Sequence, residues 1–167
     1  MGLFNKKPAK KINVPELADN IISSPLSGTV VQLSEVPDET FATGIVGDGI
    51  AVDPTEGALY APADGTIVSV FETLHAIGMA TTGGAEVLMH VGIDTVNLGG
   101  AGFTAYCKAG DQVKRGDLLL TFDKKELNKK GYLTITPVCI GNSALFQMKC
   151  AEAGTIEAGQ PLIELLK

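Results

Sequence analysis

Only two histidines occur in the sequence, His75 and His90, and each stands among residues that could support chemistry. His90 lies in AEVLMHVGIDTV (residues 85–96), where apolar residues alternate with a second row. That second row is Leu88, His90, Gly92 and Asp94. Alternation with a period of two predicts a half-buried strand, 86–93, with His90 on the face turned away from the apolar row. We expect Gly92 to leave space over the imidazole, and Asp94 to orient a ring or to receive a cation from a partner.

His75 closes a second candidate strand. In IVSVFETLH (67–75), every second residue would lie on the same face of a strand, namely Ile67, Ser69, Phe71, Thr73 and His75. The ATTGG segment (80–84) offers a turn, so the chain can double back before the strand that carries His90. We therefore expect strands 67–75 and 86–93 to be neighbours, with the two histidines facing one another across the sheet.

Such a histidine pair is suited to phosphoryl transfer. A neutral imidazole is a nucleophile toward phosphorus, and an ordinary histidine pKa near 6.5 leaves much of it uncharged at cytosolic pH. A second imidazole could donate hydrogen bonds to the incoming phosphoryl oxygens, and Thr73 could fix its tautomer. Because the sequence contains no Walker-type glycine loop or kinase signature, we expect the donor to be another phosphoprotein rather than ATP.

Other roles for the histidines stay open on these residues alone. An isolated histidine on a strand is commonly a hydrogen-bonded, partly exposed residue without a catalytic role. The sequence has no GxSxG nucleophile elbow and no HExxH motif. A catalytic zinc site normally has three protein ligands, and here only Asp94 could join the two imidazoles. A zinc hydrolase is therefore disfavoured, although metal binding is not excluded.

Two pairs of segments repeat within the chain. SPLSGTVVQL (24–33) matches APADGTIVSV (61–70), and VKRGDLLLTF (113–122) matches IEAGQPLIEL (156–165). Each pairs a turn glycine with an apolar strand, which predicts an all-β fold, an antiparallel β-sandwich or barrel with pseudo-symmetric hairpin repeats. Duplicated glycine hairpins also occur in biotinyl and lipoyl carrier domains. Lys149 in QMKC (147–150), however, has no complete half after it, so this alternative is disfavoured.

Turn signals and apolar patterns place the remaining elements. Strands are expected at 28–33, 48–53, 65–75, 86–93, 104–107, 117–122, 132–140, 145–148 and 162–166. KKELNKK (124–130) predicts a short helix, because it follows the N-cap candidate Asp123 and ends before Gly131. PDETFATGIV (37–46) predicts a second short helix or an ordered loop.

Composition restricts the class of protein. The chain has 167 residues, of which 45% are hydrophobic and 19% charged, with 20 glycines and 8 prolines, which suits one turn-rich domain. The net charge of −6 argues against a general nucleic-acid binder, because such domains need a basic face. The cysteines Cys107, Cys139 and Cys150 are odd in number and form no CxxC pair, so neither a disulfide framework nor a zinc knuckle is expected.

The N-terminus differs in charge from the rest. NKKPAKK (5–11) carries four lysines and no acid, and we expect residues 1–18 to form a flexible basic tail before a single domain at 19–167. The tail is expected to be solvated, or to contact an anionic membrane surface weakly through Leu3 and Phe4. No apolar run is long enough to predict a signal peptide or a membrane span.

Around the two histidines and over most of the chain after residue 20, the sequence closely resembles the glucose-type enzyme IIA of the bacterial sugar phosphotransferase system. The matching segments are 22–54, LYAPADGTIVSVFETLHA (59–76), VLMHVGIDTVNLGGAGF (87–103), AGDQVKRGDLLLTFD (109–123) and LTITPV (133–138). The resemblance implies an antiparallel β-sandwich that works in the cytoplasm or peripherally at the inner membrane surface. It also implies a phosphocarrier that takes a phosphoryl group from the histidine-containing phosphocarrier protein and passes it to a cysteine of an enzyme IIB domain during sugar import.

The resemblance carries roles to individual residues. His90 matches the phosphorylated histidine, attacking through Nε2; His75 matches its hydrogen-bonding partner, and Thr73 matches the residue that orients His75. Asp38 and Asp94 match acidic residues that face arginines of the partners. The residues that match the family's apolar docking ring are Phe41, Ile45, Val46, Phe71, Leu88 and Val96.

The resemblance also implies what is accessory. No cofactor is required, but some members bind zinc between the two histidines and a carboxylate from another protein, so accessory zinc is expected to fit at His75 and His90. Members also regulate other proteins according to their phosphorylation state, which leaves an additional role as an interaction module open. Gly78 and Asn97 depart from the family pattern, since better-known members carry an aromatic and an acidic residue there.

Overall fold

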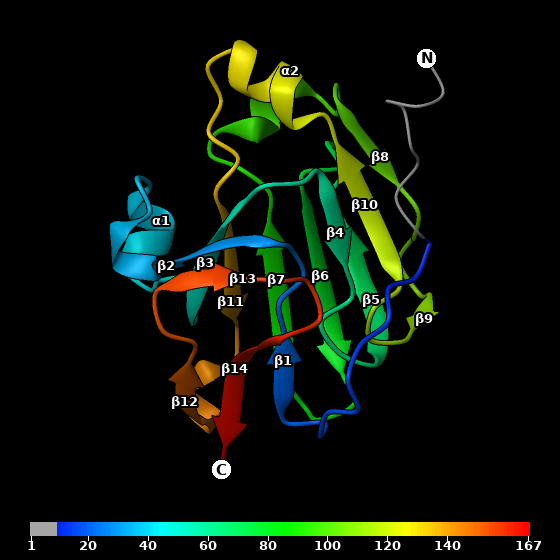
Figure 1. The fold of residues 1–167 in the computed structure, drawn as a ribbon, viewed down its shortest axis with the longest axis vertical. Helices are drawn as coiled ribbons and strands as arrows, with labels where there is room; N and C mark the ends of the chain where they lie inside the picture. The colour runs from blue at the N-terminus through cyan, green and yellow to red at the C-terminus, as the bar shows by residue number, and fades with distance from the viewer. Residues whose placement is uncertain (1–9) are drawn as a thin grey trace.

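The structure, a computed structural model, describes residues 10–167 and consists of antiparallel strands with a few short helices (Figure 1). An eight-stranded sheet has the order β13 (Gly154–Ile156), β2 (Gly28–Gln32), β3 (Asp48–Pro54), β11 (Thr136–Ile140), β7 (Glu86–His90), β6 (Ala76–Thr81), β5 (Gly65–Val70) and β9 (Gln112–Val113). A three-stranded sheet has the order β1 (Ile21–Ser23), β14 (Pro161–Leu166) and β12 (Gln147–Cys150). Another has the order β4 (Ala58–Tyr60), β10 (Leu118–Phe122) and β8 (Phe103–Ala105). This architecture confirms the predicted fold class.

The helical elements are all short. The α-helices are α1 (Glu39–Ala42) and α2 (Lys124–Lys129), and the 3₁₀ helices are η1 (Leu33–Glu35), η2 (Thr95–Leu98) and η3 (Ser143–Leu145). Asp123 caps α2 by accepting a hydrogen bond from the Glu126 amide, as the sequence predicts. The 37–46 segment forms α1, capped by Asp38, whose Oδ1 accepts from the Thr40 amide at 3.0 Å. No helix among residues 10–167 is long and apolar enough to cross a membrane.

The sequence repeats correspond to two related halves of the molecule. Gly28 pairs with Pro54 between β2 and β3, and Gly65 pairs with Thr81 between β5 and β6. The strand order β13-β2-β3-β11 is therefore repeated as β9-β5-β6-β7, and the halves meet at the β11–β7 pair. A Cβ atom at Gly28 or Gly65 would collide with a carbonyl oxygen of the neighbouring strand, which explains why both copies keep glycine.

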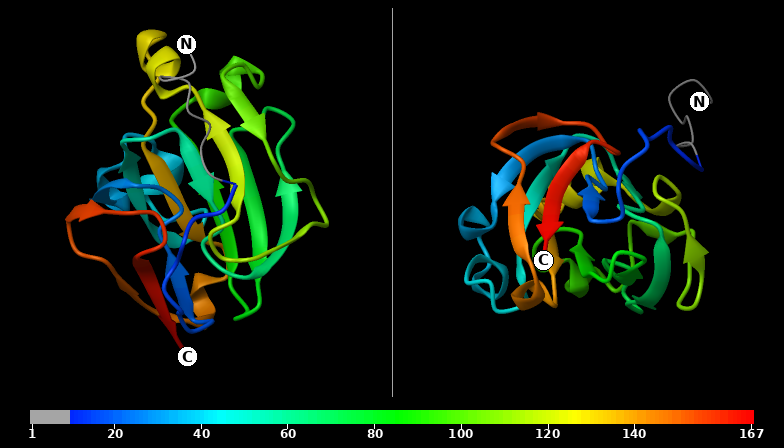
Figure 2. Two further views of the ribbon diagram at one scale, coloured as in Figure 1. Left: turned by 45° about the vertical axis from the view of Figure 1, so that its right-hand side comes forward. Right: turned by 90° about the horizontal axis from the view of Figure 1, so that it is seen from below.

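Two apolar layers lie on opposite faces of the eight-stranded sheet. The main core draws side chains from all three sheets, which curve around it (Figure 2). A smaller cluster lies on the outer face near η1 and α1, and comprises Leu33, Val36, Phe41, Ala51, Ile93 and Cys139. This outer cluster fixes α1 beside the end of β7, which is where His90 lies.

The predicted strand 65–75 is wrong in its second half. β5 ends at Val70, and the chain reverses through residues 71–75, where the Phe71 amide donates to the Ala76 carbonyl at 3.0 Å. The strand that follows, β6, lies between β5 and β7, so strands 67–75 and 86–93 are not neighbours. The reversal depends on Leu74, whose φ of 60° is a left-handed conformation that the sequence pattern does not announce.

Other differences concern strand length. The sequence pattern does not predict β1, β4, β6, β9 or β13 as separate strands. Apart from β6, each of these strands has only two or three residues, too few for a periodicity of two to be visible. The predicted 132–140 strand begins only at Thr136, and the predicted 86–93 strand ends at His90.

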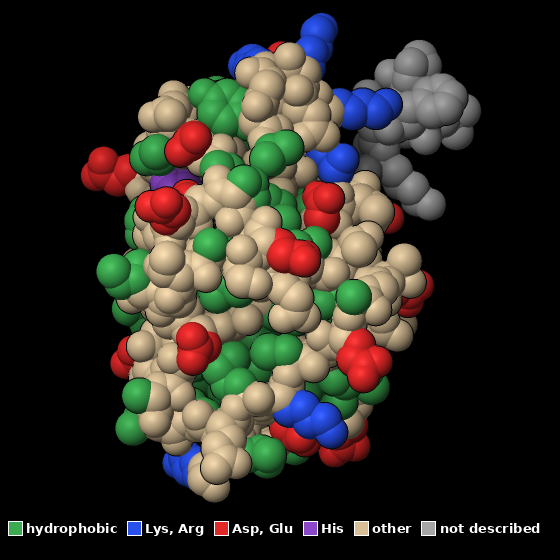
Figure 3. Space-filling model, turned by 90° about the vertical axis from the view of Figure 1, so that its left-hand side faces the viewer, with side chains coloured by type: hydrophobic (Ala, Val, Ile, Leu, Met, Phe, Trp, Pro, Cys, Tyr) green, Lys and Arg blue, Asp and Glu red, His purple; other side chains and the backbone are tan. Residues whose placement is uncertain are grey.

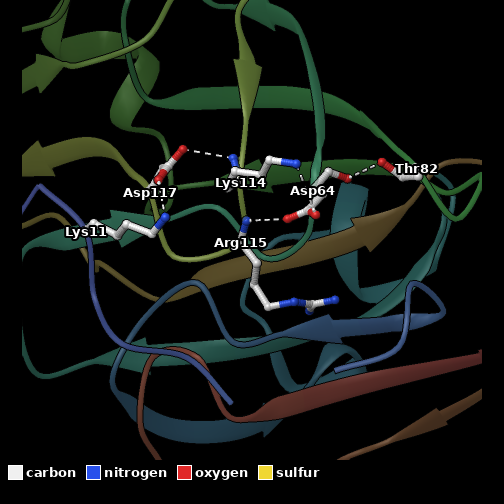
Figure 4. A network of polar contacts seen from close by, with 6 residues as sticks. All are labelled: Lys11, Asp64, Thr82, Lys114, Arg115 and Asp117. Carbon is white, nitrogen blue, oxygen red and sulfur yellow. Dashed lines mark hydrogen bonds and ion pairs between the residues drawn. The ribbon is translucent and has the colours of Figure 1, made fainter. Parts of the chain in front are cut away.

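The start of the described chain lies against the body, away from α1 (Figure 1). The Ile12 amide donates to the Gly116 carbonyl at 3.0 Å, and the Leu118 amide donates to the Lys10 carbonyl at 2.8 Å. Arg115 is only 8% exposed and donates to three backbone carbonyls, those of Ala18, Ile21 and Pro62. Figure 4 shows its neighbours Asp64 and Lys114. Leu3 and Phe4 lie outside the described residues, and the division of the chain at residue 18 stays a prediction.

Candidate functional site

His75 and His90 lie side by side at the outer face of the large sheet. His90 is the last residue of β7 and pairs with Ala76, the first residue of β6, so the preceding His75 comes alongside it. The Val91 amide also donates to the His75 carbonyl at 2.7 Å. The two ring centroids are 4.7 Å apart, with the rings at 82°. The structure thus brings together the two predicted histidines, through β6 rather than through direct pairing of the predicted strands.

A backbone carbonyl fixes the tautomer of His90. Its Nδ1 lies 2.8 Å from the Gly92 carbonyl oxygen, and because a carbonyl can only accept, Nδ1 carries the proton. The Nε2 atom is therefore left with its lone pair free. The sequence predicts that Gly92 lies on the strand face over the ring. This is wrong, because β7 ends before Gly92. It has a φ of 83°, and an added Cβ would lie 2.7 Å from the Leu133 carbonyl oxygen.

His75 is oriented by a side chain of its own turn. Its Nδ1 lies 2.7 Å from Thr73 Oγ1, as the sequence predicts. Phe71 packs edge-on against the other side of the ring, with centroids 5.5 Å apart at 81°. His75 is 3% exposed, so its ring is almost fully enclosed, whereas His90 is partly exposed.

Burial keeps both imidazoles neutral. It lowers the pKa of His75 from the ordinary 6.5 to about 4, helped by the neighbouring His90 and opposed by a weaker backbone interaction at Thr73. Burial also lowers the pKa of His90, more strongly than its bond to Gly92 and the charges of Asp38 and Asp94 raise it. At neutral pH the pair therefore consists of two uncharged rings.

Acidic and aromatic residues border His90. Asp38 stands at the N-terminus of α1, and Asp94 precedes η2 with a φ of 59°, so two different elements contribute the carboxylates. The Phe41 ring of α1 packs on His90, with centroids 4.7 Å apart. Phe41 is only 4% exposed, so it supports the imidazole from the outer cluster and offers little surface.

Exposed apolar side chains lie on the segments that carry or border the histidines. Ile45 is 79% exposed, Val96 50% and Phe71 44%, while Val46 and Leu88 are half-buried. Figure 3 shows a histidine surface bordered by acidic and apolar side chains on this face. A shallow apolar rim with carboxylates is suited to a basic protein partner.

The structure also bears on the disfavoured alternatives. Among residues 10–167, no three His, Cys, Asp or Glu side chains gather as a metal site. Zinc bound by the two imidazoles would therefore need a ligand from another molecule. Lys149 lies within β12 opposite Glu164, rather than at the hairpin tip that a swinging-arm carrier requires.

Comparisons with known proteins show the family of the chain. The sequence profile of the family described as phosphoenolpyruvate-dependent sugar phosphotransferase system, EIIA 1, matches residues 20–146. The PTS system beta-glucoside-specific EIIBCA component of Dickeya chrysanthemi is 48% identical over 155 residues, which cover 92% of this chain but only 25% of that protein. The PTS system glucose-specific EIIA component of Halalkalibacterium halodurans is 45% identical over 151 residues, 89% of this chain and 86% of that protein.

A solved structure is similar over the same region. Glucose permease IIA from Mycoplasma capricolum superposes with a TM-score of 0.81 at 34% identity, covering 86% of this chain and 93% of that one. The chain thus spans about a quarter of the beta-glucoside relatives but most of the EIIA proteins. Sequence and structure agree that the chain belongs to the EIIA 1 family of the phosphoenolpyruvate-dependent sugar phosphotransferase system.

Proposed function

We propose that the protein is a phosphocarrier in which His90 accepts a phosphoryl group from the histidine-containing phosphocarrier protein and passes it to a cysteine of an EIIB domain. The observation that carries this proposal is the pair of neutral imidazoles in contact, with Nδ1 of His90 bonded to the Gly92 carbonyl. Relatives named EIIBCA join an EIIA region to EIIB and EIIC, which supports EIIB as the acceptor.

His90 acts as the nucleophile. Its Nε2 lone pair forms the new bond to phosphorus while the bond between phosphorus and the donor's histidine breaks. The proton stays on Nδ1, so the ring gains positive charge, and the Gly92 carbonyl oxygen at 2.8 Å stabilises that charge. The lowered pKa of His90 keeps the lone pair available at neutral pH.

His75 stabilises the transferred group. In this proposal the Thr73 hydroxyl, 2.7 Å from Nδ1 of His75, donates to that atom, and the ring proton lies on Nε2. This N–H donates to a phosphoryl oxygen held between the rings. Because both partners are fixed before the reaction, little reorganisation is needed during transfer. No cofactor is required; accessory zinc would take the same two imidazoles together with a ligand from a partner.

The rim of the site recognises the partners. Asp38 and Asp94 attract basic side chains, and the exposed Ile45, Phe71 and Val96 bury apolar surface on contact. Charge attraction of this kind weakens with salt, so docking should become slower as ionic strength rises.

The test is phosphorylation by a labelled, phosphorylated phosphocarrier protein. Wild-type protein should incorporate one label, and His90→Gln none. His75→Gln should still accept the group on His90 but pass it poorly to EIIB, because the glutamine amide cannot be held by Thr73 as the ring is. Retained labelling in His90→Gln would refute the assignment of His90, and undiminished transfer to EIIB by His75→Gln would refute the role of His75.

A further inference from the structure

Two non-glycine residues near the histidines adopt a left-handed backbone conformation. Among residues 10–167, Leu74 and Asp94 are the non-glycine residues with positive φ, at 60° and 59°. Left-handed backbone is tolerated by asparagine and aspartate but is unfavourable for a large apolar residue such as leucine. Something in the folded protein must therefore hold Leu74 in this conformation.

The conformation of Leu74 determines how Thr73 and His75 face one another. The Leu74 amide donates to the Phe71 carbonyl at 2.7 Å, and the Phe71 amide donates to the Ala76 carbonyl, which closes the reversal around it. Thr73 precedes Leu74 and His75 follows it, yet Thr73 Oγ1 reaches His75 Nδ1 at 2.7 Å. A right-handed or extended Leu74 would rotate the flanking residues apart and break this bond.

Packing supplies the force that holds the turn. The side chain of Leu74 is half-buried against the main core. It also lies beside the turn that follows η2, because a Cβ added to Gly100 would be 3.9 Å from Leu74 Cγ and Cδ1. The apolar side chain therefore fastens the histidine-bearing turn to the core and to the segment that follows Asp94.

We propose that Leu74 is a positioning residue for phosphoryl transfer: its half-buried side chain holds the turn in the left-handed conformation that presents the Thr73 hydroxyl to His75 Nδ1. The inference rests on the proposed function of the site. In this turn, packing holds a left-handed conformation that asparagine or glycine would adopt through its own backbone preference.

The experiment compares three substitutions at this position. Leu74→Met keeps an apolar anchor, Leu74→Ala loses the anchor without gaining a left-handed preference, and Leu74→Asn loses the anchor but tolerates the left-handed backbone. In ¹⁵N-histidine NMR spectra, wild-type protein and Leu74→Met should show a single His75 tautomer with the proton on Nε2. Leu74→Ala should show averaged His75 nitrogen shifts, and its kcat of transfer to EIIB should fall at least ~10-fold with little change in KM. Leu74→Asn should lose less than Leu74→Ala, because its backbone preference replaces part of the packing.

Leu118→Ala is the matched control, because Leu118 is 6% exposed in a separate cluster with Ala58 and Tyr60. It should lower the midpoint of unfolding without changing the His75 spectrum. A single Nε2–H tautomer and unchanged kcat in Leu74→Ala would overturn the proposal, as would a greater loss in Leu74→Asn than in Leu74→Ala, or averaged shifts in Leu118→Ala or in Leu74→Met. If wild-type His90 is not phosphorylated, the proposed function fails, while the spectra still decide whether Leu74 positions His75.

Discussion

At the scale of single residues, the site depends on which nitrogen of each ring is bound. Gly92 binds Nδ1 of His90 through a carbonyl, and Thr73 binds Nδ1 of His75 through a hydroxyl, so in the proposed transfer both Nε2 atoms remain for the phosphoryl group. The sequence identifies both histidines and Thr73 because of residue type and spacing. It does not reveal the role of the Gly92 carbonyl, since that role follows from a φ of 83° after β7 has ended. The glycine after His90 is the one signal available beforehand.

The depressed pKa of His75 makes stability depend on pH. The unfolded chain takes up a proton at His75 near pH 6.5, whereas the folded protein takes it up only near pH 4. Between these values the unfolded state binds more protons, so the free energy of unfolding falls as pH falls, by about 1.4 kcal/mol per pH unit. We expect urea unfolding of His75→Gln to show a flatter pH profile than wild type across this window. Parallel profiles for the two proteins would contradict the depressed pKa.

At the scale of elements, the sequence predicts strands where they are long enough to show a pattern. The alternation in 85–96 correctly places His90 opposite the buried row Val87 and Met89. The pattern from Ile67 to His75 is misleading because the strand-like alternation continues through a turn, 71–75, that contains neither glycine nor proline. Backbone hydrogen bonds at Phe71 and Leu74 and the packing of Leu74 against the core accompany that turn in the folded protein. The sequence thus correctly predicts that the two histidines lie close together, but it predicts the wrong strand as the neighbour of β7.

Asp38 both caps α1 and places a charge near His90, and two substitutions separate these effects. Its carboxylate accepts from the Thr40 amide and also lies near His90. Asp38→Ala should lose both effects, with about 1 kcal/mol of stability lost because the cap is gone. Asp38→Asn should keep the cap and the stability but lose the charge. Both variants should show weaker salt dependence of phosphorylation rate. Equal destabilisation of the two variants would show that the cap is not the stabilising interaction.

At the scale of the whole molecule, Arg115 connects segments that are far apart in the sequence. Its guanidinium donates to the carbonyls of Ala18, Ile21 and Pro62, and these acceptors would lose their partner if it were removed. Arg115→Met should therefore lower the free energy of unfolding by about 3 kcal/mol, measured by urea denaturation. Lys114→Met is the adjacent control; its ion pair with Asp64 is solvent-exposed, so a change within ~0.5 kcal/mol is expected. A similar loss in both variants would refute the role of Arg115.

The two related halves of the fold differ at the position of the histidine pair. Ala76 pairs with His90 in one half, and Gly49 pairs with Cys139 in the other, so Asp48 and Cys139 stand where His75 and His90 would be repeated. Cys139 is fully buried in the outer cluster with Phe41 of α1. In the part of the chain that the structure describes, the duplicated scaffold thus carries a single histidine pair. In the proposed relay such a carrier is monovalent: donor and acceptor must take turns at one surface, so the group moves by successive collisions and never within a standing three-protein assembly.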